Sequence, residues 1–187
     1  MILKKLCMIS ILLLSSYVCA QIQKDEIITI VTSEGNIVVH LDAKRAPITV
    51  SNFINLIESD YFDESIFHRV IQDFMIQGGG FDADMNDLES NSTIPNESGN
   101  GLSNLRGTIA MARTSEAHSA YAQFFINTKD NRSLNPKSGR WGYAVFGSVI
   151  DGMDVVDKIS KKRTGPKGRF DRDVPVETVL IKNISIE

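Results

Sequence analysis

The sequence has 187 residues, and its 20 basic and 23 acidic side chains give a formal net charge of −3 at pH 7. A chain of this length can bury a core large enough to fold as one domain without a disulfide or a structural metal. The acidic balance disfavours non-specific binding to nucleic acid, so we expect no nucleic-acid partner.

The first twenty residues have the pattern of a secretory signal peptide. Lys4 and Lys5 supply a positive start, Leu6 to Leu14 form an apolar stretch, and Val18-Cys19-Ala20 suits a cleavage site. A spanning helix needs about 20 apolar residues, so a membrane anchor is the weaker alternative, and lipidation of Cys19 ranks below cleavage. We therefore expect residues 1–20 to be removed.

Cleavage there leaves residues 21–187 as the single domain. Both cysteines, Cys7 and Cys19, lie in the removed segment, and the loss of two lysines leaves 18 basic against 23 acidic side chains, a formal charge of −5. A removed signal without a membrane span predicts export to the periplasm, with secretion as the alternative. We expect the exported domain to be a monomer.

A β-hairpin and a helix are predicted at the start of this domain. Two apolar, β-branched runs, 27–31 and 37–41, flank a turn in which Gly35 can take a positive φ, as hairpins require. Apolar residues then recur at helical spacing between Pro47 and Ile57, and proline is favoured in the first turn of a helix.

Short strands separated by segments rich in Gly, Asn, Asp and Ser make up most of the remaining pattern. A second helix is predicted at about Met153 to Ser160, and Val176 to Ile186 suits a last strand. Two helices against many short strands favour a mainly β fold, a closed antiparallel barrel with helical plugs. The other predicted strands lie around Phe67 to Ile71, Phe74 to Gln77, Thr108 to Ala112, Gln123 to Asn127 and Ala144 to Val149.

Two polar segments are predicted to lie on the surface. Asp82 to Asn104 has almost nothing large enough to pack, so it should be a surface excursion. Lys161 to Arg169 is basic but contains Gly and Pro, which indicates a solvated loop, with a polyanion-binding patch as the weaker alternative.

Hydrolytic and metal chemistry lack their usual motifs. No serine stands in a G-x-S-x-G elbow, the three histidines have no H-E-x-x-H spacing, and no cysteine remains after cleavage. Gly78-Gly79-Gly80 is not followed by lysine and serine or threonine in P-loop register, so it predicts a tight turn. We expect neither a metal nor a cofactor.

The segment from Phe67 to Gly79 is the most informative part of the chain. It places Arg69 and Gln77 among Phe, Val, Ile and Met. An arginine in apolar surroundings keeps its charge, so it must be paired or must serve a ligand. On its own this pattern is weak evidence for a binding site, because a structural ion pair is the usual explanation.

This segment resembles the signature of cyclophilin-type peptidyl-prolyl isomerases. Three further blocks, 107–113, 123–127 and 142–147, match the family in the right order, and the similarity spans nearly all of Glu26 to Glu187. The long polar loop resembles that of the bacterial exported branch. The resemblance implies acceleration of cis/trans interconversion at X-Pro bonds, without a cofactor, in Pro-containing unfolded or extended segments of exported proteins.

The resemblance also implies a fold and a site. The fold is a closed eight-stranded antiparallel β-barrel capped by two α-helices, with the substrate groove on its outer face. Arg69 is the catalytic side chain in this interpretation, while Ala112 and Arg113 contribute mainly backbone hydrogen bonds. The implied substrate-binding residues are His68, Phe74, Met75, Gln77, Ala112, Arg113, Gln123, Phe125, Leu134 and Tyr143.

Some expectations depend on departures from the family pattern. Ser133 stands where cyclosporin-sensitive members carry tryptophan, which predicts weak inhibition by cyclosporin because a large contact and a donor are lost. Tyr121 would narrow the pocket for side chains upstream of proline, with neutral variation as an equal alternative. A non-catalytic module that binds Pro-containing segments, or a chaperone, is the alternative function, since it would use the same groove.

Overall fold

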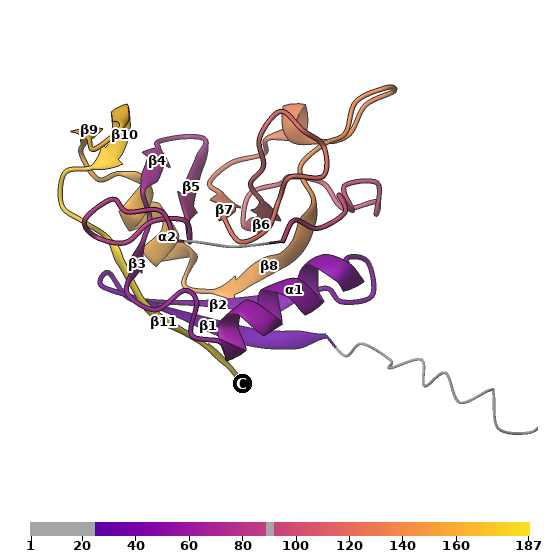
Figure 1. Cartoon of the computed structure of the whole chain (residues 1–187), viewed down its shortest axis with the longest axis horizontal. Coiled ribbons are helices and arrows are strands. Elements are labelled where there is room, and N and C mark those ends of the chain that lie inside the picture. Colours follow the sequence, from indigo (N-terminus) through magenta and orange to yellow (C-terminus); the bar gives the residue numbers. More distant parts are fainter. Residues whose placement is uncertain (1–24, 89–91) are drawn as a thin grey trace, which may run out of the picture.

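The computed structural model describes residues 25–88 and 92–187 (Figure 1). The expected signal peptide, residues 1–20, lies outside the described residues. The helices are α1 (Pro47–Glu58), α2 (Met153–Ser160) and a 3₁₀ turn, η1 (Arg132–Leu134). The strands are β1 (Glu26–Thr32), β2 (Asn36–Leu41), β3 (Ser65–Ile66), β4 (Arg69–Ile71), β5 (Met75–Gly78), β6 (Thr108–Met111), β7 (Phe124–Asn127), β8 (Val145–Asp151), β9 (Thr164–Lys167), β10 (Phe170–Pro175) and β11 (Leu180–Ile186).

The predicted hairpin and both predicted helices are confirmed. β1 and β2 pair antiparallel around the expected turn, and their alternate apolar residues are buried, as the period of two requires. α1 lies against the sheet (Figure 1), and its Phe53 is fully buried. The Phe53 ring packs against the rings of Phe62, Phe124 and Phe146 at centroid distances of 4.9, 5.5 and 5.1 Å, so the helix is fixed to the turn before β3 and to strands β7 and β8.

The prediction of a closed eight-stranded barrel is wrong. The main sheet has nine strands in the order β3-β11-β1-β2-β8-β6-β7-β5-β4, and it is open because β3 and β4 are its two edges. The sequence predicted one strand around Phe67 to Ile71, but Phe67 and His68 belong to no strand. The short strand before them, β3, pairs with β11, and β4 after them pairs with β5, so one segment supplies both edges and no ladder joins them.

The basic run expected to be a solvated loop instead contains the first strand and the turn of a hairpin. β9 and β10 form a separate two-stranded sheet, and β10 lies near β4. The Nζ of Lys167 donates to the carbonyl of Ala83 at 3.1 Å, and Arg169 forms a bidentate pair with Asp87 at 2.6 and 2.7 Å. Part of the positive charge of this run is therefore matched within the molecule.

The long polar segment is only partly the expected surface excursion. The Glu97 carboxylate accepts the N–H groups of Ile48 and Thr49 at 3.1 and 2.8 Å, so it caps α1, whose own N-cap residue makes no side-chain cap hydrogen bond. Ser98 and Asn104 are buried. The polar composition of this segment predicted exposure to solvent, but several of its polar groups instead bind it to the rest of the protein.

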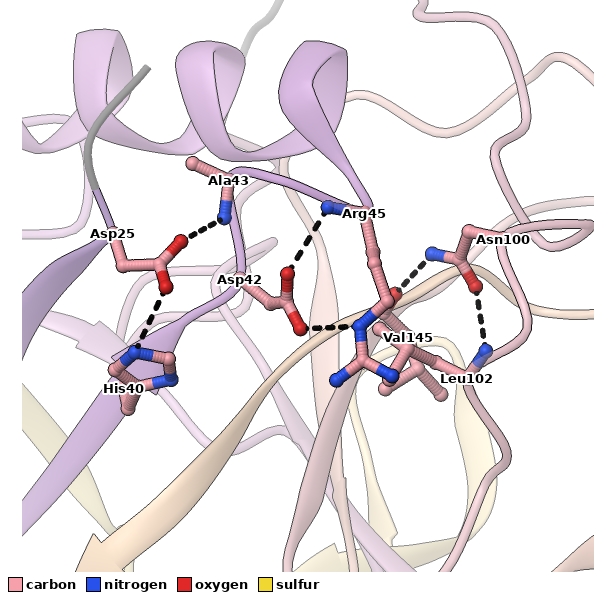
Figure 2. A network of polar contacts seen from close by, with 8 residues as sticks. All are labelled: Asp25, His40, Asp42, Ala43, Arg45, Asn100, Leu102 and Val145. Atoms are coloured by element: carbon pink, nitrogen blue, oxygen red, sulfur yellow. Dashed lines mark hydrogen bonds and ion pairs between the residues drawn. The ribbon is translucent and has the colours of Figure 1, made fainter. Parts of the chain in front are cut away.

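Figure 2 shows how the same segment and the connection before α1 are held. The Asn100 amide donates to the Val145 carbonyl of β8 at 2.9 Å and accepts the Leu102 N–H at 3.0 Å. In the connection from β2 to α1, the Asp42 carboxylate accepts both the backbone N–H and the Nε–H of Arg45. These hydrogen bonds fix the two loop segments in place.

No helix of residues 25–88 or 92–187 is long and apolar enough to cross a membrane.

Candidate active site

The β4–β5 hairpin aligns the two polar residues of the informative segment. Its register places Arg69 opposite Gln77, and the intervening Val70–Ile76 pair points into the core, where both side chains are buried. The turn between the strands is tight, and Asp73 takes a positive φ of 54°. Arg69 and Gln77 therefore share the outer face of the sheet, because cross-strand partners lie on the same side.

Nine of the eleven predicted site residues surround one pocket of about 330 Å³. Its floor is apolar, since Met75 and Phe125 are almost fully buried, and the Phe125 and Tyr143 rings meet edge to face at 5.7 Å. Leu134, from η1, forms one wall. The lining residues are Arg69, Phe74, Met75, Gln77, Ala112, Arg113, Phe125, Leu134 and Tyr143.

A chain of polar side chains crosses the rim of this pocket. One terminal nitrogen of Arg69 donates to Gln77 Oε1 at 3.2 Å, and Gln77 Nε2 donates to Gln123 Oε1 at 3.0 Å. Within residues 25–88 and 92–187, Arg69 forms no ion pair with an acidic side chain. Of the two alternatives left open by the sequence, a structural ion pair is thus not found, and the guanidinium keeps donors directed to the pocket rim.

Gln123 belongs to a second, smaller pocket of about 150 Å³ beside the first. This pocket shares Gln77, Ala112 and Arg113 with the first and adds Thr114, Ser119, Tyr121 and Gln123. The sequence analysis singled out Tyr121 here but missed Thr114 and Ser119, which belong to a loop without apolar periodicity. Thr114 Oγ1 donates to Ser119 Oγ at 2.8 Å, so the loop closes on itself.

The two expected backbone contributors differ. The N–H of Ala112 already donates to the Gln123 carbonyl at 2.8 Å, so it is not available to a peptide. The Arg113 guanidinium lies 4.6 Å from the centroid of the Tyr143 ring and donates to the carbonyls of Trp141 and Gly142. The side chain of Arg113 therefore forms part of the pocket wall, in addition to the backbone contribution that was expected.

His68 lines neither pocket. It is 1% exposed and packs between Phe81 and Phe170, with ring centroids at 4.6 and 5.8 Å. Its Nδ1 has no hydrogen-bond partner. Burial, reinforced by the nearby positive charge of Arg69, lowers the pKa of His68 to about 4, although a backbone hydrogen bond with Ile66 acts in the opposite direction. The imidazole is neutral at pH 7 and belongs to an aromatic cluster with Phe81 and Phe170.

A buried cluster of asparagines, which the sequence analysis missed, supports the apolar end of the pocket. Asn131 Nδ2 donates to the Phe74 carbonyl and to Asn127 Oδ1, both at 2.7 Å, and Asn127 Nδ2 donates to Thr108 Oγ1 at 2.9 Å. Asn127 also donates to Asn104 Oδ1 at 3.2 Å. Fully bonded buried amides fix backbone positions, so this cluster holds Phe74 at the pocket. Interleaved Asn residues in sequence resemble ordinary loop composition, which is why they gave no signal.

Neither pocket has the ligands of a metal site. The described part of the chain contains no group of three His, Cys, Asp or Glu side chains that could hold a metal ion.

Ser133, the residue on which the prediction of weak cyclosporin inhibition depends, lies in η1, and its carbonyl accepts a hydrogen bond from Arg140 at 2.8 Å. Weak inhibition by cyclosporin stays a prediction.

Comparison with known proteins places the whole domain in one family. The family model "Cyclophilin type peptidyl-prolyl cis-trans isomerase/CLD" matches residues 27–186. Peptidyl-prolyl cis-trans isomerase A of Dickeya dadantii is 48% identical over 159 residues, covering 85% of this chain and 83% of its own. A peptidyl-prolyl cis-trans isomerase of Streptomyces antibioticus is 52% identical over 158 residues, covering 83% and 95%.

The fold agrees with these sequence relatives. A crystal structure of a cyclophilin type peptidyl-prolyl cis-trans isomerase from Cryptosporidium parvum superposes with a TM-score of 0.70 at 25% identity, covering 88% of this chain and 98% of the other. The ordered motifs, the mainly β fold with two helices and the relatives near 50% identity agree. The chain therefore belongs to the cyclophilin-type peptidyl-prolyl cis-trans isomerase family and is a peptidyl-prolyl cis-trans isomerase.

Proposed function

We propose that Arg69 is the catalytic residue and that the enzyme acts, as a monomer, on Pro-containing segments of exported proteins. The observation that carries the proposal is the position of Arg69, which lies at the rim of an apolar pocket and has no acidic partner among the described residues. A buried or half-buried guanidinium without a counter-ion is costly, so its retention suits a group that serves a ligand.

The chemistry of the X-Pro bond explains why an arginine suits this place. Rotation is slow because amide resonance must be lost, with an activation energy near 20 kcal/mol. In the twisted transition state the prolyl nitrogen becomes pyramidal and gains a localised lone pair. A guanidinium N–H directed at that nitrogen stabilises a feature absent from the planar ground state, so it raises the rate without tightening substrate binding equally.

Arg69 alone does not supply the whole effect. An acceleration on the order of 10⁵ requires about 7 kcal/mol of transition-state stabilisation. One charge-assisted hydrogen bond contributes roughly 1.5 to 3 kcal/mol. We attribute the remainder to an apolar slot formed by Phe74, Met75, Phe125 and Leu134, which fixes the proline ring while the preceding carbonyl swings, and which strengthens the interaction of Arg69 by excluding water.

A non-catalytic module would need the slot but not the unpaired arginine. The hydrogen-bonded chain from Gln123 through Gln77 to Arg69 orients the guanidinium, and a binding-only groove has no use for such an arrangement. We therefore favour the catalytic interpretation over the binding module and the chaperone.

Phe125→Ala is the test of the slot. We expect KM for a Pro-containing tetrapeptide to rise roughly 10- to 100-fold, because the phenyl ring contributes about 1.5 to 3 kcal/mol of apolar contact. Exchange broadening in proton NMR of the peptide measures both binding and turnover without a coupled protease. Ile150→Ala, at an exposed apolar residue of β8 that lines no described pocket, is the control. An unchanged KM in a folded Phe125→Ala protein would contradict a slot at this position.

Export rests on the first twenty residues and is tested separately. When it is expressed with its own leader in a Gram-negative host, the protein is expected in the periplasmic fraction. Its measured mass should be that of a chain that starts at Gln21. Deletion of residues 2–20 is expected to keep it in the cytoplasm. An uncleaved protein in the membrane fraction would instead support an anchor, and a lipid-modified Cys19 would support the lipoprotein alternative.

A further inference from the structure

The slot continues into a larger hollow that the proposed mechanism does not use. This hollow has a volume of about 560 Å³ and shares Arg113, Leu134 and Tyr143 with the pocket that contains the slot, so the two form one continuous surface. Arg140 and Trp141 form its far side, and they also line a shallow hollow of about 350 Å³ next to it. A peptide held in the slot can therefore extend over Leu134 and Tyr143 toward Arg140 and Trp141.

Every charged side chain that lines these two hollows is positive. They are Arg113, Lys137 and Arg140, and no aspartate or glutamate lines either hollow. Within the described residues none of the three forms an ion pair, whereas other cations such as Arg106 and Arg169 do. The chain as a whole is acidic, with a formal charge of −3. A local excess of unmatched positive charge on an acidic protein selects for a negatively charged partner.

The hollow is formed by a segment whose backbone is fixed. Lys137 and Arg140 exchange backbone hydrogen bonds of 3.0 and 2.9 Å, and the Arg140 guanidinium donates to the Ser133 carbonyl at 2.8 Å. Arg113 donates to the carbonyls of Trp141 and Gly142 at 2.9 and 3.1 Å. A wall that is formed before the ligand arrives loses little conformational entropy on binding.

Trp141 offers an aromatic surface beside these cations. Its side chain is 47% exposed, and its ring is held edge to face against His118 at a centroid distance of 5.1 Å. Tryptophan and arginine are the residue types most enriched among the contacts that dominate binding energy. The exposed Trp141 and the neighbouring arginines are thus residue types that are typical of a binding site.

We propose that this hollow binds the segment that follows the proline of the substrate and prefers acidic side chains there. The inference rests on the proposed function, since it requires the proline ring in the slot. The first pocket shares Gln77 and Ala112 with the Tyr121 pocket, and it shares Leu134 and Tyr143 with the hollow. Because the residues before proline are assigned to the Tyr121 pocket, the residues after proline leave over Leu134 and Tyr143. We place the acidic side chains at the third and fourth residues after the proline, which lie roughly 10 to 13 Å along an extended chain.

Four peptides that share one Ala-Pro core test the preference. One carries two glutamates at the third and fourth positions after proline, one carries two glutamines there, one two lysines, and one two glutamates at the corresponding positions before proline. Proton NMR exchange at 20 mM NaCl is expected to give kcat/KM about fivefold higher for glutamate after proline than for lysine, because exposed charge pairs contribute modestly. At 500 mM NaCl the ratio is expected to approach one.

Arg140→Glu is expected to reverse the ratio between the glutamate and lysine peptides. Lys182→Glu makes the same change of charge at an exposed position of β11 that lines neither hollow, and it should keep the ratio of the parent. A preference for glutamate before proline, or equal turnover of all peptides, would overturn the inference while leaving the isomerase intact. No turnover of any peptide would instead overturn the proposed function.

Fluorescence supplies a measurement that does not depend on turnover. Trp141 is the one tryptophan of the sequence, so intrinsic emission reports directly on the hollow. The peptide with glutamates after proline is expected to shift the emission at concentrations where the lysine peptide does not. If the emission is unchanged at saturation of the slot, the segment after proline does not reach Trp141, and the inference is wrong.

Discussion

Arg69→Ala is expected to lower kcat/KM for a Pro-containing tetrapeptide on the order of 100-fold, with nearly all of the change in kcat. The guanidinium donates to a lone pair that exists only in the transition state, and loss of one such donor typically costs this much. The apolar slot remains, so KM should change little. Exchange broadening in proton NMR separates the two effects, because the variant still binds the peptide but no longer interconverts its isomers quickly.

Two further variants sharpen this test. Arg69→Lys keeps the charge but loses the planar fork that bonds Gln77, so an intermediate rate is expected. Arg172→Ala removes an arginine whose side chain is 86% exposed and lines no described pocket, and it should behave like the parent. If folded Arg69→Ala keeps the kcat of the parent, the donor is another group and the binding surface alone accounts for the activity.

His68 is expected to make the protein less stable as the pH falls from 6.5 toward 4. Its pKa is lowered from 6.5 to about 4 in the folded protein because the ring is buried beside Arg69. Between these values the unfolded chain binds a proton that the folded protein does not, so protonation favours unfolding. The stabilisation is complete above pH 6.5 and is lost as the pH falls, by about 3 kcal/mol at the lower limit.

Urea unfolding at pH 7.0, 6.0, 5.0 and 4.5 measures this effect. His68→Gln stays neutral throughout, so its free energy of unfolding should vary much less over this range, whatever its stability at pH 7. His118→Gln, at an exposed histidine, serves as the control for loss of a histidine elsewhere and should keep the slope of the parent. Parallel slopes for the parent and His68→Gln would show that the buried ring is not the group that titrates.

Nine of the predicted site residues line one pocket, and they could be found from the sequence because they lie in short motifs that follow the order of one family. Arg69 and Gln77 are cross-strand partners in one hairpin, so local spacing sets their relation. Phe125 and Tyr143 belong to other blocks, and only the resemblance to a family placed them in the same pocket. The helices and the first hairpin were predicted from periodicity, since each buries one face against the same core.

What sequence reasoning missed depends on contacts between distant polar residues. Glu97 caps a helix about fifty positions earlier in the chain, and no local pattern marks a carboxylate for that role. β9 has the sequence Thr-Gly-Pro-Lys, which lacks both alternation and β-branched runs. The barrel was expected to close because two helices against many short strands favour that architecture and because the family resemblance implied it. Whether the two edge strands of a sheet pair is a tertiary property that no local pattern marks, and β3 and β4 do not pair.

The two neighbours of β1 in the sheet determine the order in which its strand pairs can form during synthesis. β1 lies between β2, which follows it at once, and β11, which is the last strand of the described residues. Its ladder with Ile181 to Ile186 cannot form until those residues have been made, so a nascent chain leaves one side of its first hairpin unpaired. The sheet is therefore incomplete until residues 181–186 emerge, and an incompletely folded chain would suit the export that we propose.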